Sequence, residues 1–299
     1  MFTHHPLLIQ YLQMMQRSFD CAVQIEAIHG APAVCWNAGR PSKAPFNAAE
    51  FESALNALYS RNIGYFPTFT NHLVNENDLA DPIANTILQS IARRPDLNGV
   101  IVTSELLSKY VSDRFPALRQ IASVTKVTYE HGAGNVGYYR ELGRRFHRFV
   151  VDPDDSRNPQ LMDQLDRQKT EIMVNENCVA DCPSRAHHYD TYARWQKAPD
   201  SVERQIVREE VNSIVANCHS PFRLNRQGEH RRSCNLAPAE LKAIYAMGFR
   251  HFKLQGRADD PYSFAYDLVR FTCEPEFVSP LMFKSICSWL ERVLARIHN

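Results

Sequence analysis

The sequence lacks any apolar run long enough to cross a membrane, and its first residues lack the basic start, apolar core and cleavage site of a secretory signal. It also lacks an excess of charge, because 34 basic and 33 acidic residues give a net charge of +1. This balance excludes a global field that would attract nucleic acid or a membrane surface. No low-complexity segment or internal repeat divides the chain. We therefore expect a cytoplasmic protein with no membrane partner.

Eight cysteines are present, and without an export signal they are better interpreted as thiols than as a disulfide framework. Isolated cysteines among apolar residues usually pack as small hydrophobes, and four fit that description: Cys21, Cys35, Cys273 and Cys287. The other four fall in one segment beside polar and charged residues: Cys178, Cys182, Cys218 and Cys234. The second group requires an explanation of another kind.

Short runs rich in Val, Ile, Phe and Thr alternate with amphipathic helical patterns along the chain. The predicted strands lie within 21–30, 62–71, 99–104, 121–128, 148–153, 171–177, 212–218 and 249–257. The predicted helices lie within 47–61, 82–94, 135–146, 158–168, 237–248 and 280–299. Some eight strands alternating with helices favour a parallel α/β fold, and the length favours a TIM-type (β/α)8 barrel, regular or irregular, over an open sheet. We expect one barrel domain over 1–299, with 261–299 as a C-terminal helical extension.

In such a barrel, residues at the carboxyl ends of strands face the reaction chamber. The predicted strand ends carry Glu26, His29, Thr70, Asn71, Ser104, Lys126, Glu130, Asp152, Asp154, Asn175, Glu176, Lys253, Gln255 and Arg257. Each of these taken singly is more often a helix cap or a solvated loop residue. Motifs are needed to choose among them.

A glycine motif occurs in "HGAGNVGYYREL", where Gly132, Gly134 and Gly137 follow the G-x-G-x-x-G order between a predicted strand and a predicted helix. Asp152 ends the next strand at the distance where a dinucleotide fold holds a ribose. However, Glu130 stands just before the motif, where its charge would oppose a pyrophosphate, and the motif lies mid-chain. We interpret it as a strand-to-helix loop of a barrel rather than a cofactor site.

The four grouped cysteines are soft ligands that match either an iron–sulfur cluster or a closed zinc site. Three residues separate Cys178 from Cys182, thirty-five separate Cys182 from Cys218, and fifteen separate Cys218 from Cys234. A zinc ribbon or finger would show two tight C-x2-C hooks, whereas this spacing leaves the fold to assemble the site. The spacing favours a cluster embedded in an enzyme. The alternative, in which the four thiols never meet, stays open.

Two adjacent histidines, His187 and His188, follow the first cysteine pair. A Cys–His pair would serve nucleophilic catalysis if one imidazole lowered the pKa of Cys178 or Cys182. Neighbouring residues on a helix point in different directions, so at most one histidine would face such a site. A hydrogen-bonding role behind the site, or a place on a helix face, is an equally good interpretation.

Two segments together resemble the collagenase-like peptidases of family U32. The stretch "EIMVNENCVADCPSRAHHYD" is similar to that family's strand leading into a cysteine loop. The stretch "MGFRHFKLQGRADDPYSFAYDLVRF" is similar to its late Lys-Ile-Glu-Gly-Arg motif, present here as Lys253 to Arg257. Their order and separation agree with the family. The resemblance implies a barrel that, despite the family's name, is often not a protease.

Several relatives use four cysteines to hold a 4Fe–4S cluster and act in oxygen-independent hydroxylation of small molecules or RNA bases. Carried over, the resemblance implies cluster ligation by Cys178, Cys182, Cys218 and Cys234. This sequence departs from the pattern at two positions. Pro183 follows Cys182 with a shorter loop, and Gln255 replaces the glutamate of the late motif, which removes a carboxylate from the expected chamber.

The function expected from these features is iron–sulfur-dependent redox modification, of the hydroxylase type, of a small molecule or an RNA base. Lys253 and Arg257 would bind an anionic group, and Glu176 with His187 or His188 would transfer protons. An electron-donor protein or a related barrel would be the protein partner. The alternatives are a zinc- or cysteine-dependent hydrolase and a non-catalytic partner subunit stapled by a metal.

Overall fold

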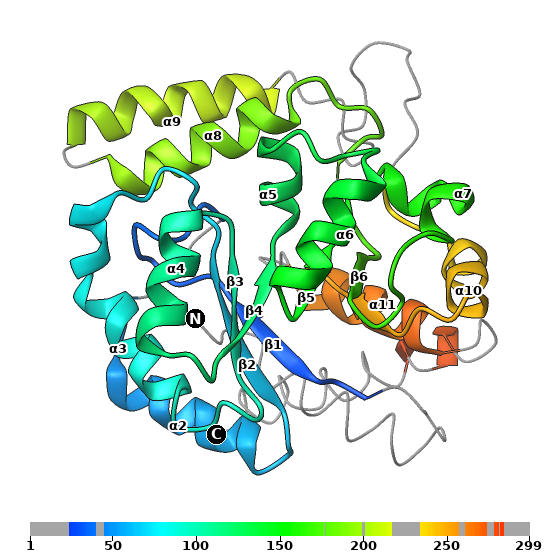
Figure 1. Ribbon diagram of the computed structural model, residues 1–299, viewed down its shortest axis with the longest axis horizontal. Helices are drawn as coiled ribbons and strands as arrows, with labels where there is room; N and C mark the ends of the chain where they lie inside the picture. Colours follow the sequence, from blue (N-terminus) through cyan, green and yellow to red (C-terminus); the bar gives the residue numbers. More distant parts are fainter. Residues whose placement is uncertain are drawn as a thin grey trace, which may run out of the picture.

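Within the residues that it describes, a computed structural model of this protein shows a sheet of seven parallel strands (Figure 1). The structure describes residues 24–39, 45–176, 178–198, 201–216, 234–256, 261–273, 278–280 and 282–283. The strands are β1 (Ala27–Gly30), β2 (Gly64–Phe69), β3 (Gly99–Val102), β4 (Arg119–Ala122), β5 (Arg148–Val150), β6 (Thr170–Met173) and β7 (His251–Lys253). Each strand pairs in parallel with the next one along the chain. The expected parallel α/β fold is confirmed.

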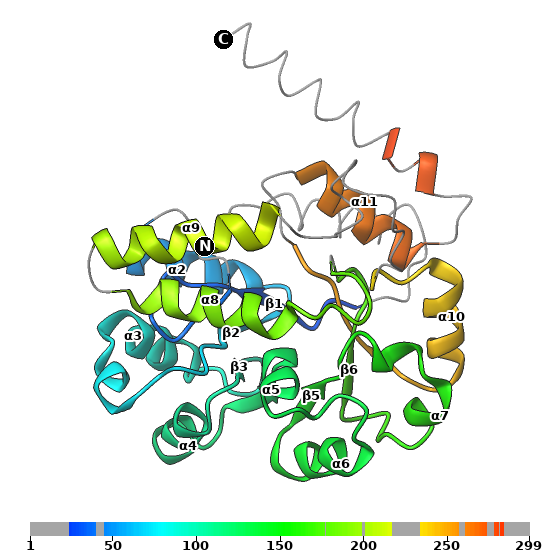
Figure 2. The same ribbon diagram turned by 90° about the horizontal axis from the view of Figure 1, so that it is seen from above.

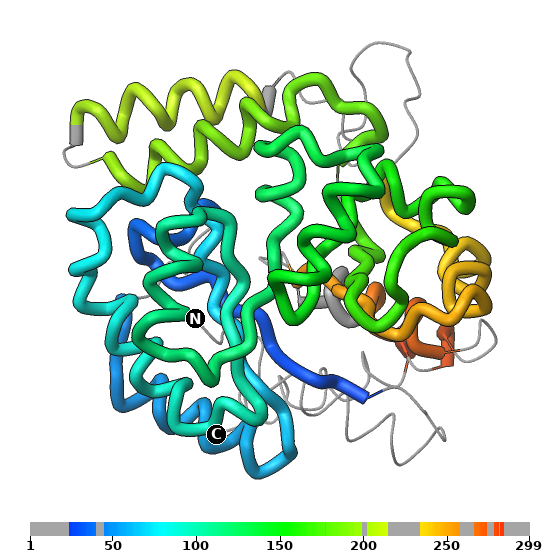
Figure 3. The backbone as a smooth tube through the Cα atoms, in the orientation of Figure 1, coloured from blue at the N-terminus to red at the C-terminus, as the bar shows by residue number. Residues whose placement is uncertain are grey.

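Helices connect the strands and cover the outside of the sheet (Figure 2). They are α2 (Ala48–Tyr59), α3 (Pro82–Ile91), α4 (Glu105–Arg114), α5 (Val124–Tyr129), α6 (Val136–Arg145), α7 (Pro159–Met162), α8 (Arg185–Lys197), α9 (Ser201–Ala216), α10 (Pro238–Ala246) and α11 (Pro261–Thr272), with 3-10 turns η1 (Glu76–Ala80) and η2 (Asp155–Arg157). Helices α8 and α9 form a hairpin across one end of the sheet (Figure 3). In the described ranges, no helix has both the length and the apolarity needed to span a bilayer.

The sheet is curled. Side chains from strands that are far apart in the strand order lie close together on its inner face. The carboxylate of Glu26, just before β1, lies 3.0 Å from Arg119 on β4, 2.5 Å from Arg148 on β5 and 4.0 Å from His251 on β7. A flat sheet would separate β1 from β5 by roughly 19 Å, at about 4.8 Å per strand. Between the described strands, no pairing joins β7 to β1. The sheet is a curled half-barrel, and a closed eight-stranded barrel is not confirmed.

Two of the expected strands are wrong in whole or in part. The strand expected at 121–128 ends at Ala122, because Ser123 caps α5 by accepting a hydrogen bond from the backbone N–H of Lys126. The strand expected at 212–218 is helical as far as Ala216, where α9 ends, and 217–218 lie outside the described residues. In both segments β-branched residues suggested a strand, but helix capping and the packing of α9 against α8 outweigh that preference.

Strand residues alternate between two apolar clusters, one on each face of the sheet. On β3, Val100 and Val102 pack outward against the helices, whereas Ile101 faces the interior with Phe66 and Met173. The larger cluster lies between sheet and helices, and it also takes buried residues from α11. The first helix of the expected C-terminal extension therefore contributes to the core.

Charged residues share the interior with the smaller apolar cluster. The side chain of Arg148 is only 8% exposed, and its guanidinium lies 2.5 Å from Glu26 and 3.9 Å from Glu171. A buried charge is tolerated only when opposite charges surround it, because desolvation alone costs several kcal/mol. This ion cluster fixes how the curled sheet is packed.

Removing the guanidinium should therefore destabilise the fold strongly. We expect Arg148→Ala to lower the free energy of unfolding by about 3–5 kcal/mol, because it deletes the buried partner of Glu26 and one of two cationic neighbours of Glu171. The matched control is Lys109→Ala, which breaks an exposed pair with Asp113 and should cost less than about 1 kcal/mol. Urea unfolding measures both values. Equal losses in the two variants would contradict the prediction.

Acid should weaken the same cluster. Burial alone would raise the pKa of Glu26, but Arg148, Arg119 and His251 hold it below its usual value. A lowered carboxyl pKa stabilises the folded state above the unfolded pKa, and that contribution is lost as pH falls through the folded pKa. Between about pH 5 and pH 3, wild-type protein should lose stability more steeply than Glu26→Gln does. Unfolding curves at each pH test this, and parallel pH profiles would disprove it.

Candidate functional site

Polar side chains at the carboxyl ends of β6 and β7 hydrogen-bond to one another. The Asn175 amide donates to the backbone oxygen of Gln255 and to Asp267, both at 2.9 Å, and its oxygen accepts from the backbone N–H of Gln255 at 2.6 Å. The Gln255 side chain in turn donates to the carboxylate of Glu176 at 2.6 Å. An amide at position 255 thus holds Glu176 in place, where a second carboxylate would repel it.

Below these strand ends, which form the rim of the sheet, Lys253 and Glu171 face the interior of the curled sheet. Burial lowers the pKa of Lys253, although the charges of Glu171 and Glu176 oppose the shift. Burial raises the pKa of Glu171, although Lys253 and Arg148 oppose that shift. Both shifts favour the neutral form. A neutral amine is a nucleophile or a base, whereas a protonated carboxyl is an acid.

The loop after β6, which carries Cys178 and Cys182, lies beside the segment before α10, which carries Cys234. Cys178 and Cys182 are hydrogen-bonded through their side chains. The backbone N–H of Cys234 donates to the carbonyl of Cys178 at 2.9 Å. The fold therefore brings together the two segments that carry three of the four expected ligands. The fourth, Cys218, lies outside the described residues.

One buried guanidinium, that of Arg185, organises this thiol site. It donates to Asp152 at 3.0 Å and Asp154 at 2.8 Å, and its other nitrogen donates to the sulfur of Cys234 at 3.4 Å. Its charge also lowers the pKa of Cys178. Arg185 is the first residue of α8, and Asp152 lies just beyond β5. The guanidinium thereby ties the cysteine loop to a neighbouring strand end.

The thiols are not activated in this arrangement. The hydrogen bond to Cys182 and then burial raise the pKa of Cys178 above its usual value. Burial, opposed by the charge of Arg185, raises the pKa of Cys234 to about 12. A cysteine nucleophile needs the opposite shift, because the thiolate is the reactive species.

Glu176 connects the thiol site to the interior amine. Its side chain is only 3% exposed, and its charge raises the pKa of both Cys234 and Lys253. Of the residues predicted to transfer protons, it is the one that the structure brings beside both groups. Arg257, the other predicted anion-binding residue, lies outside the described residues.

The two predicted histidines lie on the hairpin. His187 faces α9, where its Nε2 is 3.2 Å from a carboxylate oxygen of Glu210. His188 packs its ring against Tyr192, one turn further along α8, with 5.0 Å between ring centroids. The helix begins at Arg185 and carries both residues away from the strand ends, so their closeness to the cysteines in sequence does not place them in the thiol site.

The thiol donors suit an iron–sulfur cluster, because such clusters bind soft thiolates. No group of three His, Cys, Asp or Glu side chains within the described ranges is arranged to hold a metal ion. The expected donor residues lie on two neighbouring segments, and ligation by them stays a prediction.

The glycine motif does not follow a strand, as a dinucleotide fingerprint requires. It lies between α5 and α6, two helices, and this corrects the expected strand-to-helix position. Gly134 has a positive φ of 75°, and its N–H donates to Asp155 at 2.7 Å. A carboxylate of the protein takes the N–H that a phosphate would need.

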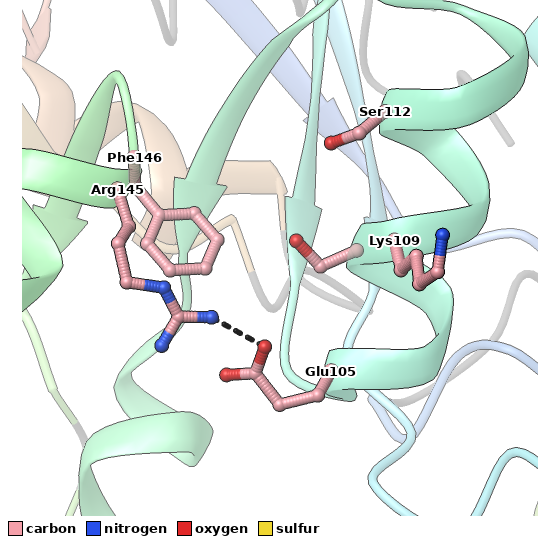
Figure 4. A pocket seen from close by; sticks show the side chains of 6 residues that line it. Glu105, Lys109, Ser112, Arg145 and Phe146 are labelled. Atoms are coloured by element: carbon pink, nitrogen blue, oxygen red, sulfur yellow. Dashed lines mark hydrogen bonds and ion pairs between the residues drawn. The ribbon is translucent and has the colours of Figure 1, made fainter.

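A hollow of about 330 Å³ opens outside the sheet, between α4 and α6 (Figure 4). It is lined by Glu105, Ser108, Lys109, Ser112, Arg145 and Phe146. An ion pair between Glu105 and Arg145 spans it, and the buried amine of Lys126 also reaches Glu105. Its acidic group already has these cationic partners, so we assign no ligand to it.

Comparisons with known proteins give one similar structure. No family model and no curated protein matches the chain. A solved structure of a U32 peptidase is similar over 78% of this chain and 85% of that one, at 14% identity and a TM-score of 0.47. The function of this chain has to be argued from its own residues.

Sequence reasoning missed Arg185 and Glu171. Glu171 was visible as an acidic residue inside an apolar strand, where a charge is costly and so demands a partner. Arg185 gave no such signal, because its carboxylate partners lie about thirty residues earlier in the chain, at 33 and 31 positions.

Loss of the guanidinium should open the thiol site. We expect Arg185→Ala to cost about 3–5 kcal/mol, because buried Asp152 is left unpaired, and to speed the reaction of Cys234 with a disulfide reagent. The control is Arg194→Ala, which breaks a half-exposed pair with Asp190 and should leave thiol reactivity unchanged. Timed labelling followed by peptide mass spectrometry measures both. Unchanged labelling of Cys234 in Arg185→Ala would refute the assignment.

Proposed function

We propose that this protein is a barrel-type redox enzyme whose cysteine site holds a 4Fe–4S cluster and whose interior chamber binds the substrate. The cluster ligands would be Cys178, Cys182, Cys218 and Cys234. The observation that supports the proposal is that the segment of Cys178 and Cys182 lies beside the segment of Cys234, far from it in the chain. Arg185 bonds the sulfur of Cys234 and acts on the pKa of Cys178. The cluster would supply one-electron transfer.

The surroundings of the thiols suit a negatively charged thiolate centre. Arg185 places a permanent cation 3.4 Å from Cys234, and Asp152 and Asp154 fix its orientation. Hydrogen bonds and charges around the sulfurs are what tune such a centre. Arg185 would therefore stabilise ligand thiolates that burial otherwise disfavours.

The chamber residues have separate roles in this proposal. Lys253 would bind the substrate, with Arg257 holding an anionic group. Glu176, fixed by Gln255, would carry protons between the chamber and the thiol site. The substrate would be a small molecule or an RNA base, and an electron-donor protein or a related barrel would be the partner.

A cysteine-dependent hydrolase is less well supported. Its nucleophile would need a low thiol pKa and a nearby imidazole, whereas the pKa values of Cys178 and Cys234 are raised and His187 pairs with Glu210. The fold alone does not choose among functions.

Metal and sulfide analysis of anaerobically purified protein tests the proposal. We expect a brown protein with about four irons and four sulfides per chain. Serine at Cys178, Cys182, Cys218 or Cys234 should remove at least about half of that iron, because each change deletes a thiolate ligand.

The matched control is Cys273→Ser, at a partly buried thiol packed against the apolar core away from the three grouped cysteines. This variant should keep its full iron content. A colourless wild-type protein with about one tightly held zinc would refute the iron–sulfur proposal. Full iron content in all four ligand variants would refute the ligand assignment.

A further inference from the structure

The amine of Lys253 has an unusual environment for a lysine inside a protein. Lys253 ends β7 beside Met173 of β6, on the face of the sheet that points inward. In the described part of the chain, its Nζ has no hydrogen-bond or ion-pair partner. The residue is nevertheless partly accessible. A structural lysine at such a position would be expected to pair with a carboxylate, as Lys126 does with Glu105 and Glu130.

Several charged or titratable groups surround this amine at longer range. Glu171 and Glu176 act on its pKa, and Lys253 in turn acts with Arg148 on His29, whose pKa burial already holds well below its usual value. Burial is the largest influence on the amine and lowers its pKa. Desolvated lysines of this kind are the ones that proteins use as nucleophiles.

Glu171 provides an acid on the same face of the sheet. Its side chain is 5% exposed, and among the described residues its Oε1 is buried without a hydrogen-bond partner. Burial raises its pKa, so the carboxyl can carry a proton. The amine thus has a proton donor within its surroundings.

We propose that Lys253 forms an imine with its substrate, which makes the substrate a small aldehyde or ketone. The proposal rests on the chamber assigned above and names the class of molecule that would occupy it. It does not depend on whether the thiol site holds a cluster.

The step balances without an oxidant or reductant. The nitrogen lone pair of neutral Lys253 attacks the carbonyl carbon, and a C–N bond forms while the C–O double bond becomes single. Glu171 gives its proton to the oxygen, and the nitrogen loses one proton to solvent. A proton from solvent then reaches the hydroxyl, which leaves as water, and the nitrogen lone pair completes the C–N double bond. The products are one protonated imine and one water.

Borohydride trapping of the full-length protein tests this step, with glyoxylate as the aldehyde probe and pyruvate as the ketone probe. Borohydride reduces an imine to a stable amine, which peptide mass spectrometry locates. We expect Lys253 to be modified at least about twofold faster than exposed Lys109 by one or both probes, since a lowered pKa leaves more of the amine neutral. Lys253→Arg should remove the adduct at that position.

Glu171→Gln provides a second variant that keeps Lys253. We expect it to slow trapping at Lys253 by about a hundredfold through loss of the acid, with labelling of Lys109 unchanged. Labelling of Lys253 no faster than Lys109 with both probes would overturn the proposal and leave the amine as a fixed cation. Iron content measured on the same samples reports separately on the thiol site, so failure of one proposal is distinguishable from failure of the other.

Discussion

Inside a folded protein a guanidinium needs a carboxylate, and Arg148 reaches Glu26 across the interior of the curled sheet. Strand β5 cannot move away from β1 without leaving a buried charge unpaired. The curl that results also points alternate residues of β6 and β7 inward, which is how Glu171 and Lys253 come to share one space. The shared position of Glu171 and Lys253 therefore depends on an ion pair to which neither residue belongs.

A second buried guanidinium is paired with carboxylates at the rim of the sheet. Arg185 is buried between Asp152 and Asp154, and it begins the helix that follows the cysteine loop. The other end of that helix is held as well, because Asn71 donates to the carbonyl of Ala193 at 3.1 Å and Lys197 pairs with Asp78 at 2.7 Å. Helix α8 is thus fixed at both ends, and the thiol loop is stretched between a strand end and a rigid helix.

The sequence predicted the parallel α/β fold because short apolar runs such as 99–104 have the length and composition of buried strands. It placed strands wrongly where the intrinsic strand preference of a segment disagrees with its packing in the fold. The run at 121–128 is rich in Val and Thr, yet Ser123 and buried Lys126 make it a helix. The cysteine site stays a prediction, made from the sequence because the residue type itself carries the chemistry. The contacts of Arg185 and His187 could not be predicted, because their partners, Asp152 and Glu210, come near only in the folded chain.

The position of Glu176 has an electrostatic consequence. Its negative charge raises the pKa of the Cys234 thiol on one side and of the Lys253 amine on the other. One buried carboxylate is thus an electrostatic neighbour of both regions, and a substitution at this single position would change the surroundings of the thiol and of the amine together.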